Sequence, residues 1–193
     1  MLKHFDHIQR SLTKKVLIDY DQILTDINNL INEEKLEEIA TLIDSSKRVY
    51  FYGIGSSGLV VMEIKSRFMR LGVVCDAITD KNNLIWTTTI LDSSCLVIGL
   101  SLSGQTEEVM EYLDLAAQKG AATALLTTKT FSTTQTHKIF PIASVRNLCT
   151  EFILWQSDFT SIPLLIMLDI IYAYFQAIDR EKKRFLNKQS YIK

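Results

Sequence analysis

Residues 51–58 read FYGIGSSG, and this glycine-rich stretch follows directly on the apolar residues Val49 and Tyr50. A β-branched and aromatic run that ends in glycines is typical of a strand leading into a tight turn. Residues 58–71 then have helical periodicity, and Gly72 predicts the end of that helix. The stretch therefore predicts a strand, a glycine turn and a helix whose first N–H groups can bind an anion.

The same cycle recurs along the chain. Residues 95–100 (CLVIGL) predict a buried strand, 101–106 (SLSGQT) a polar turn, and 107–119 a helix that Gly120 ends. Further strands are predicted at residues 73–78, 122–126 and 139–142. Strands that alternate with helices indicate an α/β fold, and right-handed crossovers give a flavodoxin-like five-stranded parallel sheet in the order 2-1-3-4-5. Helices would cover both faces, with the two turns at the C-terminal edge.

Helical patterns occupy both ends of the chain. Residues 8–31 and 33–43 predict two amphipathic helices, and residues 155–185 a long apolar helix with a break near Pro163. We expect residues 1–32 to form a helical extension and residues 33–193 to form one domain. The apolar surface of the first and last helices exceeds what a small sheet can cover, which predicts a homodimer or homotetramer.

Composition excludes several classes of protein. The 193 residues carry 21 basic and 22 acidic side chains, so no basic surface for nucleic acid is expected from this chain. Cys75, Cys95 and Cys149 lie far apart, which predicts neither disulfides nor a zinc site. We see no signal-peptide core and no apolar run of membrane-spanning length, and residues 162–171 read as a buried helix. These features predict a cytoplasmic protein without a membrane partner.

Two kinds of phosphate site fit the first turn. A dinucleotide site would need an acidic residue at the end of the second strand, and Asp76 suits that role. The second turn favours a single phosphate, because the hydroxyls of Ser101, Ser103 and Thr106 can surround one without a metal or a lysine. By itself SLSGQT is also compatible with an ordinary polar turn and a helix cap. No cofactor is predicted, and the candidate phosphosugar-binding residues of the two turns are Gly55, Ser56, Ser57, Ser101, Ser103, Gly104, Gln105 and Thr106.

These turns carry a family resemblance. From about residue 35 to 178 the chain resembles the sugar isomerase (SIS) domain, through G-x-G-x-S at 53–57 and S-x-S-G-x-T at 101–106. Within that family it is most similar to the C-terminal effector domain of RpiR-family transcription regulators, through Lys14–Leu17 (KKVL), Met69–Gly72 and the pair Thr79-Asp80. The resemblance implies a sugar phosphate ligand, control of carbohydrate metabolism genes, and DNA binding only through a helix-turn-helix domain, which residues 1–193 lack.

The chain also departs from that family. Gln105 replaces an acidic residue of the second motif, and Ser157, Asp158, Thr160 and Ser161 occur where a basic residue is usual. The alternative function is a stand-alone phosphosugar isomerase, of the hexulose- or arabinose-phosphate type, with Glu151 as the base that the resemblance implies. In the regulator Glu151 would instead bind sugar hydroxyls. His4, His7 and His137 are all expected at the surface, and so few acid–base groups favour binding over catalysis.

Overall fold

The protein is a three-layered α/β domain built on one five-stranded sheet. The computed structural model describes residues 2–128, 137–141 and 161–190, and the side chains of residues 13–128, 137–141 and 161–182. All neighbouring strands are parallel and the order is β2-β1-β3-β4-β5, which confirms the predicted topology. The strands are β1 (Arg48–Tyr52), β2 (Cys75–Ile78), β3 (Cys95–Leu100), β4 (Ala122–Thr127) and β5 (Lys138–Pro141).

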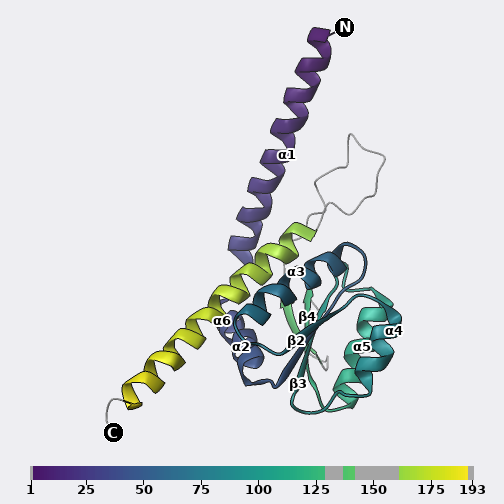
Figure 1. Ribbon diagram of the computed structural model, residues 1–193. Helices are drawn as coiled ribbons and strands as arrows, with labels where there is room; N and C mark the ends of the chain where they lie inside the picture. The colour runs from purple at the N-terminus through teal and green to yellow at the C-terminus, as the bar shows by residue number, and fades with distance from the viewer. Residues whose placement is uncertain (1, 129–136, 142–160, 191–193) are drawn as a thin grey trace.

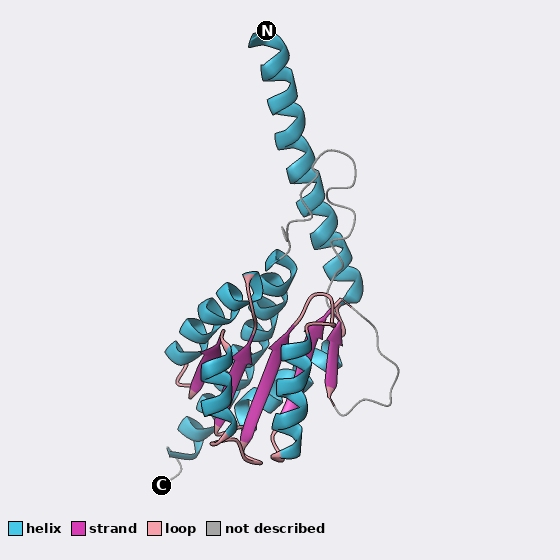
Figure 2. Ribbon diagram, turned by 90° about the vertical axis from the view of Figure 1, so that its right-hand side faces the viewer, coloured by secondary structure: helices cyan, strands magenta, loops and turns pink. Residues whose placement is uncertain are grey.

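Helices cover both faces of this sheet (Figure 1). They are α1 (Leu2–Leu30), α2 (Glu33–Ser45), α3 (Ser56–Arg70), α4 (Lys81–Thr88), α5 (Glu107–Gln118) and α6 (Ser161–Ser190). Figure 1 shows α2, α3 and α6 on one side and α4 with α5 on the other, and Figure 2 shows the sheet between them.

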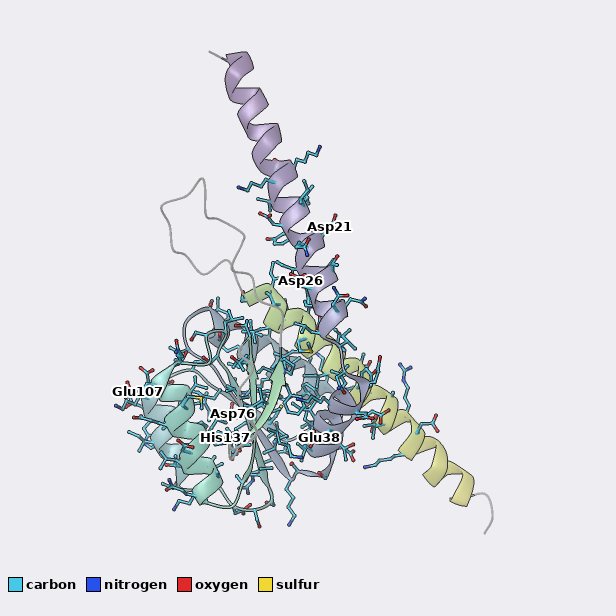
Figure 3. The ribbon with its side chains drawn as sticks, turned by 180° about the vertical axis from the view of Figure 1, so that it is seen from behind. Asp21, Asp26, Glu38, Asp76, Glu107 and His137 are labelled. Carbon is cyan, nitrogen blue, oxygen red and sulfur yellow. The ribbon has the colours of Figure 1, made fainter. Side chains whose placement is uncertain are left out.

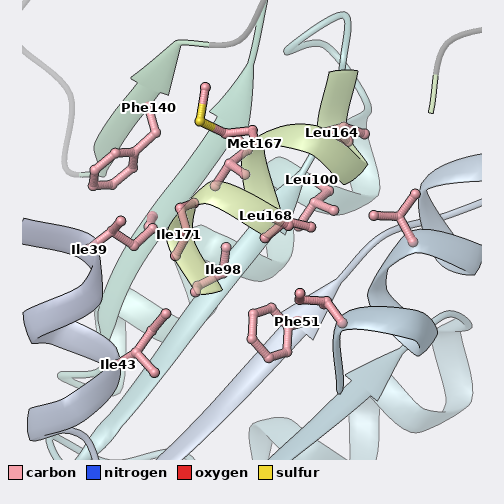
Figure 4. Packing of buried hydrophobic residues seen from close by; sticks show 14 of the residues in the cluster. Ile39, Ile43, Phe51, Ile98, Leu100, Phe140, Leu164, Met167, Leu168 and Ile171 are labelled. Carbon is pink, nitrogen blue, oxygen red and sulfur yellow. The ribbon is translucent and has the colours of Figure 1, made fainter. Parts of the chain in front are cut away.

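The two faces have separate cores because successive strand residues point to opposite sides. Phe51 of β1 and Ile98 of β3 belong to the larger core, where Ile39 of α2 and Leu168 of α6 pack (Figure 4). Tyr52 of β1 belongs to the smaller core, under α4 and α5. Helix α6 contacts both α2 and α3, so it holds that layer together.

Helix α4 was not predicted from the sequence. Its segment, KNNLIWTT, has no apolar stripe, and none of its residues is buried. The Asp80 carboxylate starts the helix instead, because it accepts hydrogen bonds from the N–H groups of Asn82 and Asn83, each at 3.0 Å. The helix therefore forms because of a local cap and not because of an apolar stripe, so apolar periodicity alone does not predict it.

Helix α6 also differs from expectation. Pro163 does not break it, because it lies in the first turn, where its missing N–H group has no intrahelical partner to lose. By length and composition Ser161–Lys182 could span a membrane, which corrects the expectation that no run was long enough. Leu164, Leu168 and Ile171 of this helix are fully buried against the domain. We therefore assign α6 as the core helix of that layer.

Helix α1 projects away from the domain (Figures 1 and 2). Among the side chains described on α1, from residue 13 onward, those of Ile23 and Ile27 are buried in the larger core. Asp21 and Asp26 lie in the same half of α1, and beyond them the helix continues outward (Figure 3). The predicted helical extension is confirmed, and most of its length is not in contact with the sheet.

Candidate phosphate-binding site

The two serine-containing turns lie at the same edge of the sheet. β1 and β3 are neighbours and pair in register up to Tyr52 and Gly99, so both turns leave the C-terminal ends of adjacent strands. The chain then continues into α3 on one face and α5 on the other. This is a topological switch point, where parallel α/β sheets form a crevice that binds ligands. The placement of both turns at this edge was predicted and is confirmed.

The first turn is tight and depends on its glycines. The N–H group of Gly53 donates to the carbonyl of Ile78 at 3.2 Å, which holds the turn against the end of β2. A Cβ atom at Gly53 would lie 2.8 Å from the carbonyl oxygen of Ser57, which is a clash. Gly55 has φ +61° and begins α3 without a side-chain cap. The first N–H groups of α3 therefore have neither an intrahelical partner nor a capping side chain, and they suit an anion.

The serines of this turn differ in exposure. Ser56 is half-buried, whereas only 7% of Ser57 is exposed. Ser56 can therefore present its hydroxyl to a ligand, while Ser57 packs into the start of the helix.

The second turn is closed by a hydrogen bond between two of the predicted phosphate-binding residues. The Ser101 and Thr106 hydroxyl oxygens lie 2.8 Å apart, and the Thr106 N–H donates to the Ser101 hydroxyl at 3.4 Å. The Gly104 N–H donates to the Ser101 carbonyl at 3.0 Å, with φ +60° at Gly104. Ser101 is 2% exposed, so in this conformation it shapes the turn from beneath.

Ser103 is the accessible hydroxyl of this turn. It is exposed and accepts a hydrogen bond from the N–H of Gln105 at 3.2 Å. A hydroxyl that accepts one bond still has its proton to donate, so Ser103 is suited to an anion above the turn. Gln105 is exposed beside it. The structure thus brings Ser56, Ser103 and Gln105 to the surface of the edge and buries Ser57 and Ser101 below them.

Two threonines that the sequence analysis did not select anchor this turn. The hydroxyls of Thr127 and Thr128 both donate to the carbonyl of Leu102, at 3.3 and 2.7 Å, and the Thr128 N–H donates to it at 3.1 Å. Both threonines follow the buried run of β4, so a polar pair at that strand end was the signal that could have identified them. They fix the second turn to a third strand.

The two turns have no charged side chain of their own, since residues 53–58 read GIGSSG and residues 101–106 read SLSGQT. Glu107 and Glu108 are exposed in the first turn of α5, and Figure 3 shows Glu107 at the periphery. An anion at this edge would therefore be held by hydroxyl and N–H donors and by the two helix N-termini.

Asp76 is poorly placed for a dinucleotide ribose. It is the second residue of β2 and pairs with Tyr50, two residues before the strand ends. Its carboxylate accepts hydrogen bonds from Lys65 Nζ of α3 at 2.5 Å and from the Ala77 N–H at 2.8 Å. The geometry therefore favours the small phosphate over the dinucleotide.

The expectation that His137 lies at the surface was wrong. It is 7% exposed, its Nδ1 lies 2.8 Å from the Thr123 hydroxyl, and its Nε2 lies 2.9 Å from the Asp114 carboxylate. The polar partners on β4 and α5 made burial favourable, and neither was evident from sequence spacing. His137 precedes β5, at the edge opposite the serine turns, as predicted.

Several residues considered in the sequence lie outside the described side chains. Glu151, Cys149 and residues 157–160 lie outside the described residues, and so do the side chains of His4 and His7. Cys95 is buried and Cys75 is partly buried. Burial raises the pKa of the Cys75 thiol to about 11, so this thiol is not activated.

Known proteins resemble this chain in sequence or in fold. A 28% identical relative over 163 residues is an uncharacterized HTH-type transcriptional regulator of Haemophilus influenzae; the match covers 84% of this chain and 56% of the regulator. The chain thus spans little more than half of that relative's length.

Two solved structures show the same fold. The sugar isomerase domain of an RpiR transcription factor from Sphaerobacter thermophilus superposes with a TM-score of 0.71 at 18% identity, covering 90% of this chain and 96% of that one. The Vibrio vulnificus NanR protein complexed with ManNAc-6P gives 0.75 at 18% identity, covering 94% of this chain and 67% of NanR. The SIS domain model matches residues 42–156, which include both serine turns, and the resemblance stated from those turns is confirmed: this chain belongs to the SIS domain family.

Proposed function

We propose that this chain is the phosphosugar-binding effector domain of an RpiR-type transcriptional regulator of carbohydrate metabolism. The observation that carries the proposal is the pair of serine turns on adjacent strands at the switch point, each opening a helix. The HTH-type relative and the NanR complex with a sugar phosphate support it. DNA would be bound by a helix-turn-helix domain of a longer chain, in the cytoplasm.

The proposed ligand contacts follow from the exposure of each residue. The phosphate would accept hydrogen bonds from the hydroxyls of Ser56 and Ser103 and from the first N–H groups of α3 and α5. Ser101 and Thr106 would maintain the turn, or donate after their mutual bond opens. Gln105, together with Glu151, would bind sugar hydroxyls. The proposed site comprises Gly55, Ser56, Ser57, Ser101, Ser103, Gly104, Gln105, Thr106 and Glu151, within a binding domain at residues 33–193 that follows the extension at 1–32.

The test is calorimetry of hexose and pentose phosphates against the unphosphorylated sugars. The phosphorylated forms should bind far more tightly, and Ser103→Ala should weaken their binding by about ten- to a hundredfold, because a hydrogen bond to a charged group is lost. Ser93→Ala is the matched control, since Ser93 is exposed before β3, at the opposite edge of the sheet.

Two results would contradict the proposal. Equal affinity for a sugar and its phosphate would exclude a phosphate site. Conversion of a bound aldose phosphate to the ketose, lost in Glu151→Gln, would instead assign the chain to the isomerases.

We also propose that the domain is a homodimer or homotetramer that associates through α1. Val16, Leu17 and Leu24 of this helix are 48%, 59% and 51% exposed, although they are apolar. Isolated helices are marginally stable in water, so a projecting helix with this composition needs a partner.

A further inference from the structure

One side of α1 is exposed and faces away from the domain. Residues 14, 17, 18 and 21 follow the spacing of three, four and seven that puts side chains on one side of a helix. They are Lys14, Leu17, Ile18 and Asp21, and all four are exposed. The exposed fractions of Leu17 and Ile18 are 59% and 54%, which is high for two adjacent apolar residues. We call these four residues the outer face of α1; the helix packs on the domain through its opposite side.

The two charged groups of the outer face have no partner within the described part of the chain. No ion pair or side-chain hydrogen bond there involves the Lys14 ammonium or the Asp21 carboxylate. They lie seven residues apart, about 10 Å along the helix, so they cannot pair with each other. Unpaired charges are ordinary on a solvated helix, but here they flank an exposed apolar pair.

The outer face is complementary to itself. Along the helix its order is basic, apolar, apolar, acidic, so the same face turned end for end reads acidic, apolar, apolar, basic. Two antiparallel copies with an axis between residues 17 and 18 would place Lys14 opposite the partner's Asp21 and bring both apolar pairs together. A two-fold symmetric interface needs one surface that fits its own copy, and the outer face meets this requirement.

The charge of the whole helix favours the same direction. Residues 2–15 contain four basic side chains and one acidic, whereas residues 16–30 contain three acidic and no basic side chains. A parallel pair would align like charges along its length, and an antiparallel pair aligns opposite ones. With the axis between residues 17 and 18, residues 5–12 lie opposite residues 23–30. The projecting half of each helix (Figure 1) would then run along the half that joins the partner's domain.

We propose that two copies of this chain pair antiparallel through the outer face of α1, about a two-fold axis between Leu17 and Ile18. The assignment rests on the proposed association through α1 and specifies its contact residues and its direction. Leu17 and Ile18 of both copies exclude water around the axis, and the two Lys14–Asp21 ion pairs fix direction and register. Figure 3 shows Asp21 on the stretch of α1 that leaves the domain, where a second helix can approach it.

Charge reversal at the outer face tests this pairing, with sedimentation velocity at micromolar concentration and low ionic strength. Lys14→Asp sets a carboxylate opposite the partner's Asp21, so two attractive pairs become repulsive and the association should weaken by about ten- to a hundredfold. Asp21→Lys should weaken it similarly, because it sets two lysines opposite each other. The chain with both changes restores opposite charges and should associate within about threefold of the wild type.

Two further measurements separate pairing from a general effect of charge. A mixture of the two single variants should form a heterodimer, because each supplies the charge that the other lacks. Lys15→Asp is the matched control, since it makes the same charge change at the adjacent position, outside the outer face, and should weaken association by about threefold or less.

The outcomes distinguish the pairing from the association on which it rests. Equal effects of Lys14→Asp and Lys15→Asp, or no recovery in the chain with both charge reversals, would overturn the antiparallel pairing and leave association through α1 in place. A monomeric wild-type chain at this concentration would overturn both.

Discussion

At the residue scale, the described site is a set of neutral donors whose positions depend on buried neighbours. Ser103 is accessible because Ser101, Thr106 and Gly104 close the turn beneath it. The Leu102 carbonyl accepts hydrogen bonds from two threonine hydroxyls, which fix that turn to the end of β4. Changes to these supporting groups should therefore alter ligand binding without removing a ligand contact.

His137 gives a prediction about stability at the same scale. His137→Ala removes both ring nitrogens, so the buried hydroxyl of Thr123 loses its partner. An unsatisfied buried polar group costs about 1–3 kcal/mol, and a cavity adds to that cost. Urea denaturation should show a free energy of unfolding lower by at least this amount.

A matched variant tests the cause. Asp114→Asn keeps an acceptor near His137 on an exposed side chain and should lower the stability by less than 1 kcal/mol. A small effect of His137→Ala, equal to that of Asp114→Asn, would mean that the buried bond contributes little.

At the element scale, α6 covers the larger core. It packs against α2 and α3 and presents its buried residues to the sheet (Figure 4). An ion pair between Arg67 of α3 and Asp169 of α6 adds to this contact at the surface. The apolar contact should contribute most, because exposed ion pairs are worth about 0–1 kcal/mol.

Leu168→Ala tests that assignment. Leu168 is fully buried, and truncating a buried leucine typically costs about 2–5 kcal/mol because a cavity remains. Leu59→Ala in α3 is the control, since Leu59 is 72% exposed and should change stability by about 0.5 kcal/mol or less. Thermal or urea unfolding measures both, and equal effects would show that α6 is not part of the folded core.

At the scale of the whole molecule, α1 has apolar surface that a single chain leaves uncovered. The helix leaves the domain with apolar residues on its surface (Figure 1). In the proposed dimer, those residues would be covered by a second copy, as two-fold symmetric interfaces require the same surface on both chains.

Charged substitutions on α1 test this association. Leu17→Lys combined with Leu24→Lys places two buried charges in the proposed interface and should convert the oligomer to a monomer in sedimentation velocity at micromolar concentration. Gln22→Lys combined with Asn29→Lys adds the same charge to exposed polar positions on the other side of the helix and should leave the oligomer intact. A wild-type monomer at that concentration, or dissociation by both pairs alike, would contradict an α1 interface.

The sequence by itself determined the sheet and the location of the two turns. Buried strands such as Cys95–Leu100 read as apolar runs, and the glycines after them marked each turn, because both signals are local. The strand order followed, since right-handed crossovers leave few topologies for such a pattern. The family resemblance came from the same two turns, and residues 53–57 and 101–106 lie within the matched domain.

The tertiary structure decided which side chains of those turns are accessible and what surrounds them. Ser101 and Ser103 look equivalent in the sequence, yet one closes the turn and the other faces outward. Burial of His137 beside Thr123 and packing of the Tyr52 ring against Tyr112 depend on contacts between residues distant in the chain. Local patterns carry no information on such contacts, because exposure and electrostatic environment arise only when separate elements pack together.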